Sequence, residues 1–197
     1  QAALSNDPMA NFNPEANFRI NTDATIKLAK LCKSVGIKRF TFASSASIYD
    51  EAKIGREKNE ESFVAPTAAY SLSKYKAEQK LIALADKNFC PVILRQGTVY
   101  GYSPRMRYDL VVNAMFKSAL TERKIKVFCG GRQWRPLVAV KDVAIAHIKA
   151  IEAPEPLVRG QIFNIVYKNY RVFELAEIIK NFLATKYDIK VDIENEM

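Results

Sequence analysis

Histidine and cysteine are scarce among the 197 residues, which contain one histidine and three cysteines. The one histidine, His147, shares a predicted helical face with Val143, Ala144 and Ile151, so we interpret it as structural. This interpretation removes a histidine-based catalytic triad and a histidine-rich metal site from consideration. The cysteines, Cys32, Cys90 and Cys129, are odd in number and far apart, so they do not form a disulfide framework or a metal site. We expect buried thiols in reducing surroundings.

Long hydrophobic runs are also absent. No apolar run approaches the roughly 20 residues that cross a bilayer, and residues 1–7 lack the basic start and apolar stretch of a signal peptide. We therefore expect a cytoplasmic protein without a membrane partner. The 49% of hydrophobic residues is enough for a substantial core in one or two domains.

Acidic residues are fewer than basic ones: 21 aspartates and glutamates stand against 30 lysines and arginines, which gives a net charge of +9. The lysines and arginines are spread along predicted helices, without a dense basic block interleaved with stacking aromatics, so we expect no nucleic-acid partner. An anionic small substrate explains part of the excess positive charge, and solvated helix faces explain more.

Helices and strands alternate over the first half of the chain. Helical spacing of Ala24, Leu28, Leu31, Cys32 and Val35 predicts a helix from about residue 13, and Gly36 is suited to its C-terminal cap. A strand is predicted over 39–43 and is followed by a cluster of serines. A helix that carries Ala77 and Leu81 comes next, with Thr67 as its predicted N-cap. A buried strand is then predicted over 90–95. This alternation is typical of a parallel sheet covered by helices.

After Tyr100 and Gly101 the pattern changes. Helices are predicted near 109–120, from Asp142 to about 151, and over 172–182, with strands near 125–129 and 161–166. We expect a first domain over 1–100 with the returning strand 161–166, and a second region over 101–160 and 167–197.

Tyr70 and Lys74 lie four residues apart on one predicted helix, so their side chains share a face. A free tyrosine has a pKa near 10, and a neighbouring ammonium favours the phenolate. With the hydroxyl of Ser45 holding a substrate oxygen, Tyr70 could remove a proton from a carbinol. Taken alone, the four-residue spacing of Tyr70 and Lys74 also suits an exposed, non-catalytic helix turn, and this alternative stays open for the isolated Tyr-x-x-x-Lys motif.

Six ordered segments resemble the extended short-chain dehydrogenase/reductase group, specifically its NAD-dependent sugar-nucleotide epimerases and dehydratases. The segments are Ala2 to Asp7, Asn21 to Thr25, Phe42 to Tyr49, Tyr70 to Lys74, Leu94-Arg95 with Val99-Tyr100-Gly101, and Arg135 to Val138 leading to Val140-Lys-Asp142. The resemblance implies an α/β fold: a Rossmann-like parallel sheet without its N-terminal βαβ units, and a smaller α/β region that binds the sugar nucleotide.

The same resemblance implies roles for individual residues. Ser45, Tyr70 and Lys74 would be catalytic; Ala2, Ala3, Ser44, Tyr70, Lys74 and Gln96 would contact the cofactor, NAD or NADP; Asn21, Ser45, Ser47, Thr98, Asn113 and Arg135 would contact the substrate, with no metal. Two alternatives stay open. Asn21 could simply brace its helix, and Arg135 could be a surface charge, although a guanidinium offers paired donors to a diphosphate.

The family's Gly-x-x-Gly-x-x-Gly phosphate-binding turn is absent, because none of the 7 glycines stand in that spacing. We expect that turn to lie upstream of Gln1 and the chain to be a fragment that binds NAD poorly by itself. A second departure is Ala46-Ser47 after Ser45, where the family's dehydratases often carry Asp-Glu as proton carriers.

The function that follows is an NAD-dependent epimerase. It would act on a nucleotide-diphosphate sugar through a transient ketone, in surface polysaccharide or sugar-nucleotide biosynthesis, as a homodimer. A 4,6-dehydratase, an NAD(P)H-dependent reductase and a non-catalytic dinucleotide-binding sensor or scaffold are the alternatives.

Overall fold

The computed structural model describes residues 3–5, 7–49 and 57–196. They form two compact units, each described by itself. Unit 1 lies within residues 1–96 and 144–165, and unit 2 within 97–143 and 166–197.

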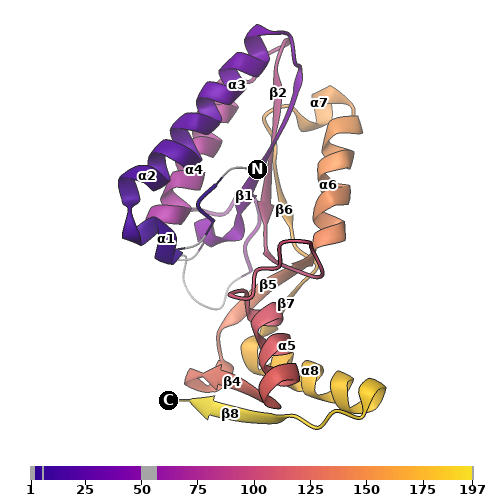
Figure 1. The fold of residues 1–197 in the computed structure, drawn as a ribbon. Helices are drawn as coiled ribbons and strands as arrows, with labels where there is room; N and C mark the ends of the chain where they lie inside the picture. Colours follow the sequence, from indigo (N-terminus) through magenta and orange to yellow (C-terminus); the bar gives the residue numbers. More distant parts are fainter. Residues whose placement is uncertain (1–2, 6, 50–56, 197) are drawn as a thin grey trace. The chain divides into compact units, whose positions relative to one another are not determined.

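Unit 1 is built on a parallel sheet of three strands, drawn in the upper half of Figure 1. β1 (Arg39–Ser45) pairs with β2 (Cys90–Gln96), and β2 pairs with β6 (Ile162–Ile165). In this register Ser45 lies opposite Gln96, which lies opposite Ile165. The carboxyl ends of the strands therefore meet at one edge, the edge at which open α/β sheets bind ligands.

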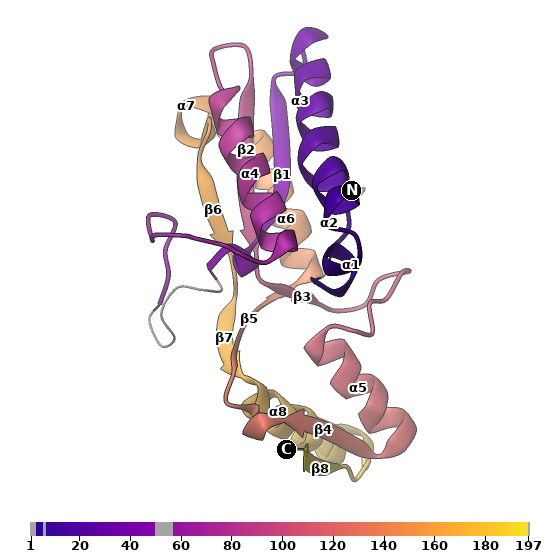
Figure 2. The same cartoon turned by 90° about the vertical axis from the view of Figure 1, so that its left-hand side faces the viewer.

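Helices cover both faces of this sheet. α3 (Thr25–Ser34) and α4 (Ala69–Ala83) lie side by side on one face, and α6 (Val140–Glu152) lies on the other (Figures 1 and 2). Alternate strand residues serve the two cores. One core contains Ile26, Ala29, Phe42, Ala77, Leu81, Phe89 and Ile93, and the other contains Cys90, Val92, Leu94, Ala150 and Val158. This packing holds the start of α4 near the carboxyl ends of the strands.

The helix predicted from about residue 13 is divided. α1 (Asp7–Phe12) precedes α2 (Pro14–Phe18), a π-helical turn η1 (Arg19–Ala24), and then α3, after which Gly36 takes a φ of +83°. The apolar stripe that predicted the helix is not its buried face, because Leu28, Leu31 and Val35 are exposed. Ile26 and Ala29 face the core instead. α3 carries two apolar stripes, and only its packing decides which one is covered.

The segment between β1 and β2 carries the predicted chemistry. A single turn of 3₁₀ helix, η2 (Ala46–Tyr49), follows β1 directly. α4 begins at Ala69, and Ala68 occupies the N-cap position without a side-chain hydrogen bond. The prediction of Thr67 as the N-cap is therefore wrong.

Unit 2 contains a mixed sheet and a two-stranded parallel sheet. β5 (Trp134–Ala139) pairs in parallel with β3 (Thr98–Tyr100) and antiparallel with β7 (Lys168–Arg171). β4 (Lys124–Phe128) pairs with β8 (Asp192–Glu196), and α5 (Val111–Glu122) and α8 (Val172–Tyr187) pack on a core that includes Met115, Ile125, Val127, Leu175 and Ile179. A short turn, η3 (Cys129–Gly131), follows β4.

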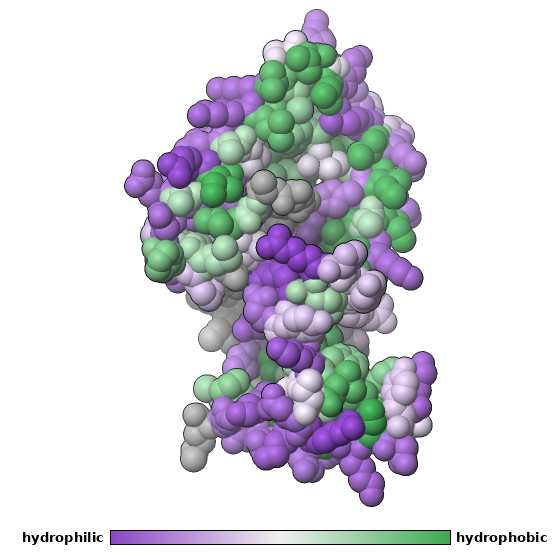
Figure 3. All heavy atoms as spheres, in the orientation of Figure 1, coloured by the Kyte–Doolittle hydropathy of each residue, from purple (hydrophilic) through white to green (hydrophobic). Residues whose placement is uncertain are grey.

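The unit boundaries differ from the domain boundaries expected from the sequence. Residues 144–160, expected in the second region, belong to unit 1, because Ala150 and Val158 pack against β2. Residues 155–158 form the short helix α7 (Glu155–Val158), which includes Val158. On the face shown in Figure 3, apolar side chains gather where Figure 1 draws α6; Ile145, Ile148 and Ile151 are about half exposed there.

The cysteines are free thiols, as predicted, but only Cys90 is buried. Cys129 is exposed because it begins the turn η3, where its φ is +49°, so the expectation of burial is wrong for this residue. Among the described residues, no group of histidine, cysteine and carboxylate side chains could hold a metal ion. Within the same part of the chain, no helix has the length and apolarity to cross a bilayer.

Candidate active site

Lys74 is buried at the sheet edge of unit 1, with 6% of its surface exposed. Its Nζ donates a hydrogen bond of 3.0 Å to the backbone oxygen of Ala43, near the end of β1. The same Nζ lies 4.9 Å from the ring centre of Phe42 and 6.0 Å from that of Tyr70. The ammonium is therefore enclosed between a strand and the tyrosine one turn before it.

Burial lowers the pKa of Lys74 from 10.5 to about 8, and the negative charge of Glu78 partly opposes this effect. Because this pKa lies above 7, Lys74 is mainly charged at pH 7. A partly desolvated cation interacts more strongly with a neighbouring phenol than a cation in water does, and it favours the phenolate.

Ser45 ends β1, and its Oγ accepts hydrogen bonds from the Ser47 backbone N–H at 3.2 Å and from the Ser47 hydroxyl at 2.9 Å. Ser47 lies in η2. Because α4 packs against both β1 and η2, the elements that carry these two hydroxyls adjoin the helix that carries Tyr70 and Lys74.

The neighbouring hydroxyl of Ser44 has no hydrogen-bond partner among the described residues, although Ser44 is only 4% exposed. An unsatisfied buried hydroxyl costs about 1–3 kcal/mol, so a polar ligand at this edge would remove a penalty. This orphaned oxygen fits a bound cofactor, with Tyr70 and Lys74 as further polar contacts.

Gln96, at the end of β2, lies against His147. The Gln96 amide nitrogen is 3.0 Å from His147 Nε2, and His147 Nδ1 is 3.0 Å from the Thr41 hydroxyl. An amide nitrogen donates, so His147 Nε2 accepts and its Nδ1–H donates to Thr41. Burial lowers the pKa of His147, which favours this neutral form. These contacts agree with a structural role for His147, which orients Gln96.

Asn21 is 1% exposed and uses its amide within the protein. Its Oδ1 accepts from the Leu4 backbone N–H at 3.0 Å, and its Nδ2 donates to the Leu4 oxygen at 2.9 Å and to Asn17 Oδ1 at 2.7 Å. These bonds correspond to the bracing alternative for Asn21. They fix the backbone next to Ala3, while Ala2 lies outside the described residues.

The remaining predicted substrate contacts belong to unit 2. Thr98 begins β3, Asn113 is 8% exposed with its Nδ2 bonded to the Arg107 oxygen at 3.0 Å, and Arg135 is exposed on β5. Among the residues that the structure describes, the one acceptor for Arg135 is the Trp134 oxygen, at a long 3.4 Å, so its guanidinium has further donors that could bind an anion.

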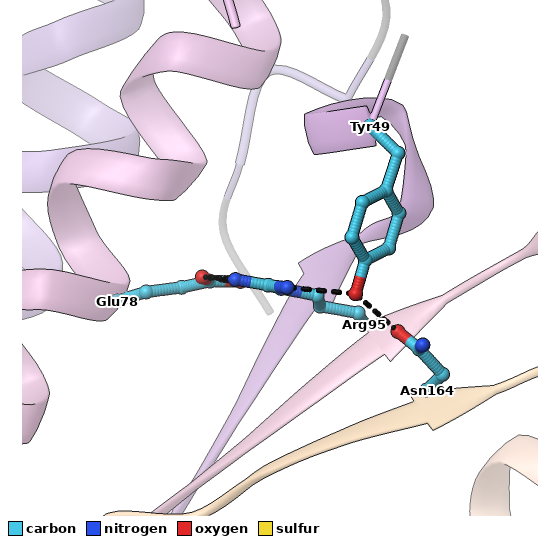
Figure 4. Close-up of polar contacts among 4 residues, drawn as sticks. All are labelled: Tyr49, Glu78, Arg95 and Asn164. Atoms are coloured by element: carbon cyan, nitrogen blue, oxygen red, sulfur yellow. Dashed lines mark hydrogen bonds and ion pairs between the residues drawn. The ribbon is translucent and has the colours of Figure 1, made fainter. Parts of the chain in front are cut away.

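One polar network near Lys74 was not predicted from the sequence. Arg95 on β2 donates from Nε and Nη2 to the carboxylate of Glu78, and from Nη1 to the Tyr49 hydroxyl, which donates to Asn164 (Figure 4). The available signal was the position of Glu78, one turn after Lys74 on the same helix face.

Sequence comparison assigns the family. The sequence model described as the NAD dependent epimerase/dehydratase family matches residues 1–166. The chain belongs to this family.

Over 158 residues it is 33% identical to YtcB of Bacillus subtilis (strain 168), named an uncharacterized UDP-glucose epimerase, with 78% of the chain and 46% of that protein covered. Over 144 residues it is 30% identical to the UDP-glucose 4-epimerase of Vibrio cholerae, covering 69% of the chain and 41% of that protein. The chain thus spans less than half the length of these two relatives.

Solved structures agree with the family assignment. The UDP-N-acetylglucosamine 4-epimerase from Methanobrevibacter ruminantium M1, solved in complex with UDP-N-acetylmuramic acid, matches with a TM-score of 0.85 and 26% identity over 100% of the chain and 63% of its own. The UDP-glucuronic acid 4-epimerase from Bacillus cereus shares the fold at a TM-score of 0.81 and 21% identity, over 98% of the chain and 60% of its own. The predicted Rossmann-like α/β fold is confirmed.

Proposed function

We propose that this chain provides the acid–base machinery of an NAD-dependent epimerase acting on a nucleotide-activated sugar. The observation that carries the proposal is the buried Lys74 ammonium, held at the carboxyl end of β1 one helical turn from Tyr70, with the hydroxyl of Ser45 on the adjoining strand end. A desolvated cation beside a phenol is an arrangement that costs stability and prepares an acid–base group.

In this proposal Tyr70 exchanges the proton of a sugar hydroxyl. The Ser45 hydroxyl, oriented by Ser47, donates to the sugar oxygen and holds it in place for the transfer. Lys74 stabilises the phenolate before the proton arrives. NAD, when bound, supplies the hydride chemistry. Return of the proton from Tyr70 after the sugar has presented its other face completes the inversion.

Epimerisation is preferred to dehydration because of η2. Ala46 and Ser47 stand where the family's dehydratases often place two carboxylates, and the Ser47 hydroxyl is bonded to Ser45. Elimination of water needs an acid and a base beside the sugar, and neither alanine nor serine is suited to that task. The names of the relatives from Bacillus, Vibrio and Methanobrevibacter support the same choice.

The nucleotide diphosphate would be held by unit 2. The exposed guanidinium of Arg135 is suited to a diphosphate because it offers paired donors, and Asn113 and Thr98 are the further candidates. On the cofactor side, Ser44 and Gln96 lie at the ends of β1 and β2, near the Ala43 oxygen to which Lys74 is bonded. Ala3 directly precedes Leu4, whose backbone is bonded to Asn21, and NAD or NADP would fit these candidates.

We also propose a cytoplasmic homodimer. The free thiols of Cys32, Cys90 and Cys129 suit a reducing compartment. The exposed stripe of Leu28 and Leu31 on α3 is an apolar surface that a second copy would cover. Light scattering of the complete protein, at concentrations spanning the micromolar range, measures the mass directly.

Product analysis by NMR tests the proposed function. The complete protein is incubated with NAD and a panel of UDP- and dTDP-sugars, without added reductant. An epimerase yields a stereoisomer of the same composition, whereas a dehydratase yields a product with one water fewer. A dehydrated product, or a requirement for stoichiometric NADH, would contradict the proposal.

A further inference from the structure

Glu78 and Arg95 form a buried ion pair one helical turn beyond Lys74. Their exposed fractions are 1% and 2%, and Arg95 Nη2 donates to Glu78 Oε2 at 2.7 Å while its Nε donates to Oε1 at 3.1 Å. Lys74, Glu78 and Arg95 are the buried charged side chains of the described part of the chain. Burying charges is costly even when they are paired, so their grouping beside the proposed active site points to a role.

Glu78 acts electrostatically on Lys74. The two residues are four apart on α4, on one helix face, and the carboxylate opposes the lowering of the Lys74 pKa by burial. The other polar groups that face Lys74 are Tyr70 on α4 and the Ala43 carbonyl on β1.

The remaining charged side chains that the structure describes on α2, η1, α3 and β1 are exposed or bonded to other partners. Glu15, Arg19, Asp23, Lys27 and Lys30 on α2, η1 and α3 are exposed. Lys33 pairs with Asp86, and Arg39 donates to the Ala153 oxygen. Among the side chains that the structure describes, Glu78 is therefore the carboxylate that shares the buried environment of Lys74.

Arg95 also reaches the turn that carries the serine hydroxyls. Its Nη1 donates to the Tyr49 hydroxyl at 2.7 Å, its guanidinium carbon lies 5.0 Å from the Tyr49 ring centre, and the Tyr49 hydroxyl donates to Asn164 Oδ1 on β6 at 2.9 Å (Figure 4). Tyr49 is the last residue of η2, the turn that follows Ser45. One guanidinium therefore joins α4 to η2, and through Tyr49 to β6.

We propose that Glu78 and Arg95 are positioning residues of this site: Glu78 keeps Lys74 protonated beside Tyr70, and Arg95, through Tyr49, holds the serine-bearing turn against α4. The catalytic consequence rests on the proposed function, whereas the effect of Glu78 on Lys74 does not require turnover. Lysine is no substitute for Arg95, because a single ammonium lacks the planar fork that grips a carboxylate and still donates to a third group.

The Lys74 titration tests the charge effect without an activity assay. In the complete protein labelled with 13C-lysine, NMR follows the Lys74 side chain with pH, its signal assigned with Lys74→Arg. In Glu78→Gln we expect the midpoint to fall below about 8 by about one pH unit or more, the typical effect of losing a close opposite charge. The matched control, Glu155→Gln, breaks the more exposed Glu155–Arg159 pair and should leave the midpoint in place.

Glu78→Gln leaves the Arg95 charge buried without its partner. Should this variant fail to fold, Glu78→Leu/Arg95→Met removes both charges and is expected to fold, since apolar residues often replace a buried ion pair without loss of stability. It should still show a lower Lys74 midpoint than the wild type. An unchanged midpoint in whichever of the two variants folds would overturn the charge inference.

Kinetics separate positioning from packing. In Glu78→Gln the alkaline limb of the kcat profile should move to lower pH, with KM for the nucleotide sugar changed little. In Tyr49→Phe, kcat should fall while that limb stays in place. Reduced activity in Glu78→Gln with an unmoved limb would mean a packing role and would overturn the proposal. A shifted Lys74 midpoint in a protein that turns over no nucleotide sugar would instead count against the proposed function and support the charge inference.

Discussion

Replacing Lys74 with methionine should make the protein more stable and inactive at once. The pKa of Lys74 lies at about 8 in the folded protein, because burial lowers it from 10.5. At about 1.4 kcal/mol per pH unit, holding this lysine charged at pH 7 costs about 3 kcal/mol of folding free energy. Methionine fills the same space without a charge but forfeits the bond to Ala43, worth about 1 kcal/mol. The net expectation is a gain of about 2 kcal/mol in the free energy of unfolding at pH 7.

The pH dependence identifies the origin of that gain. Between pH 8 and 10.5 the unfolded chain binds a proton at Lys74 that the folded protein has released, so the contribution of Lys74 to the free energy of unfolding rises with pH in this window. Lys74→Met lacks this contribution. The difference between the two proteins should therefore shrink as the pH is raised from 7 to 10.

Urea unfolding of the complete protein at pH 7 and pH 9.5, followed by circular dichroism, measures the difference. Lys76→Met is the matched control, because Lys76 lies two positions further along α4 and is exposed; its stability should stay within about 0.5 kcal/mol of the wild type at both pH values. If Lys74→Met is no more stable than the wild type at pH 7, or if the two proteins respond identically to pH, the reasoning about the buried charge is wrong.

Two further predictions concern stability. Gly131→Ala should lower the free energy of unfolding by about 2–4 kcal/mol, measured by urea titration. The reason is that Gly131 has a φ of +61° and that an added Cβ would lie 2.6 Å from the Phe173 nitrogen. An unchanged urea midpoint would refute the backbone conformation assigned to Gly131. His147→Gln should reduce the acid sensitivity of folding: burial lowers the His147 pKa below 6.5, so the unfolded state binds more protons and the wild type loses stability as the pH falls through this region. Parallel unfolding curves for the two proteins from pH 7 to 5 would contradict this.

The sequence is most informative where periodicity extends over many residues or where a motif carries its own chemistry. The helices over α3 and α4 and the strands β1 and β2 were predicted, as were Ser45, Tyr70 and Lys74 as residues of adjoining elements. By contrast, β3 and β7 span only three and four residues, too few for an alternation pattern to be distinguished from a loop.

Long-range pairing explains what was missed. In the sequence, Glu78 is one of several charged residues on a helix and Arg95 is a charged residue near the end of a strand. Only the fold brings these two side chains, 17 positions apart, into contact. In the same way, the amide of Asn21 suits either a ligand or a brace, and the proximity of Leu4 decides how it is used in the structure. Spacing shows only that Glu78 shares a helix face with Lys74; neither its pairing with Arg95 nor the contact of Asn21 with Leu4 can be derived from spacing or composition.

The most direct test of the proposed acid–base role is the rate of sugar-nucleotide turnover in Tyr70→Phe, compared with Tyr75→Phe on the same helix, both in the complete protein with NAD present. Loss of the phenol at position 70 should lower kcat by about 100-fold or more, the usual contribution of a positioned acid–base group, while NAD binding is retained. Tyr75→Phe should turn over at the wild-type rate. Turnover by Tyr70→Phe at the wild-type rate would contradict the assignment of Tyr70 as the proton carrier.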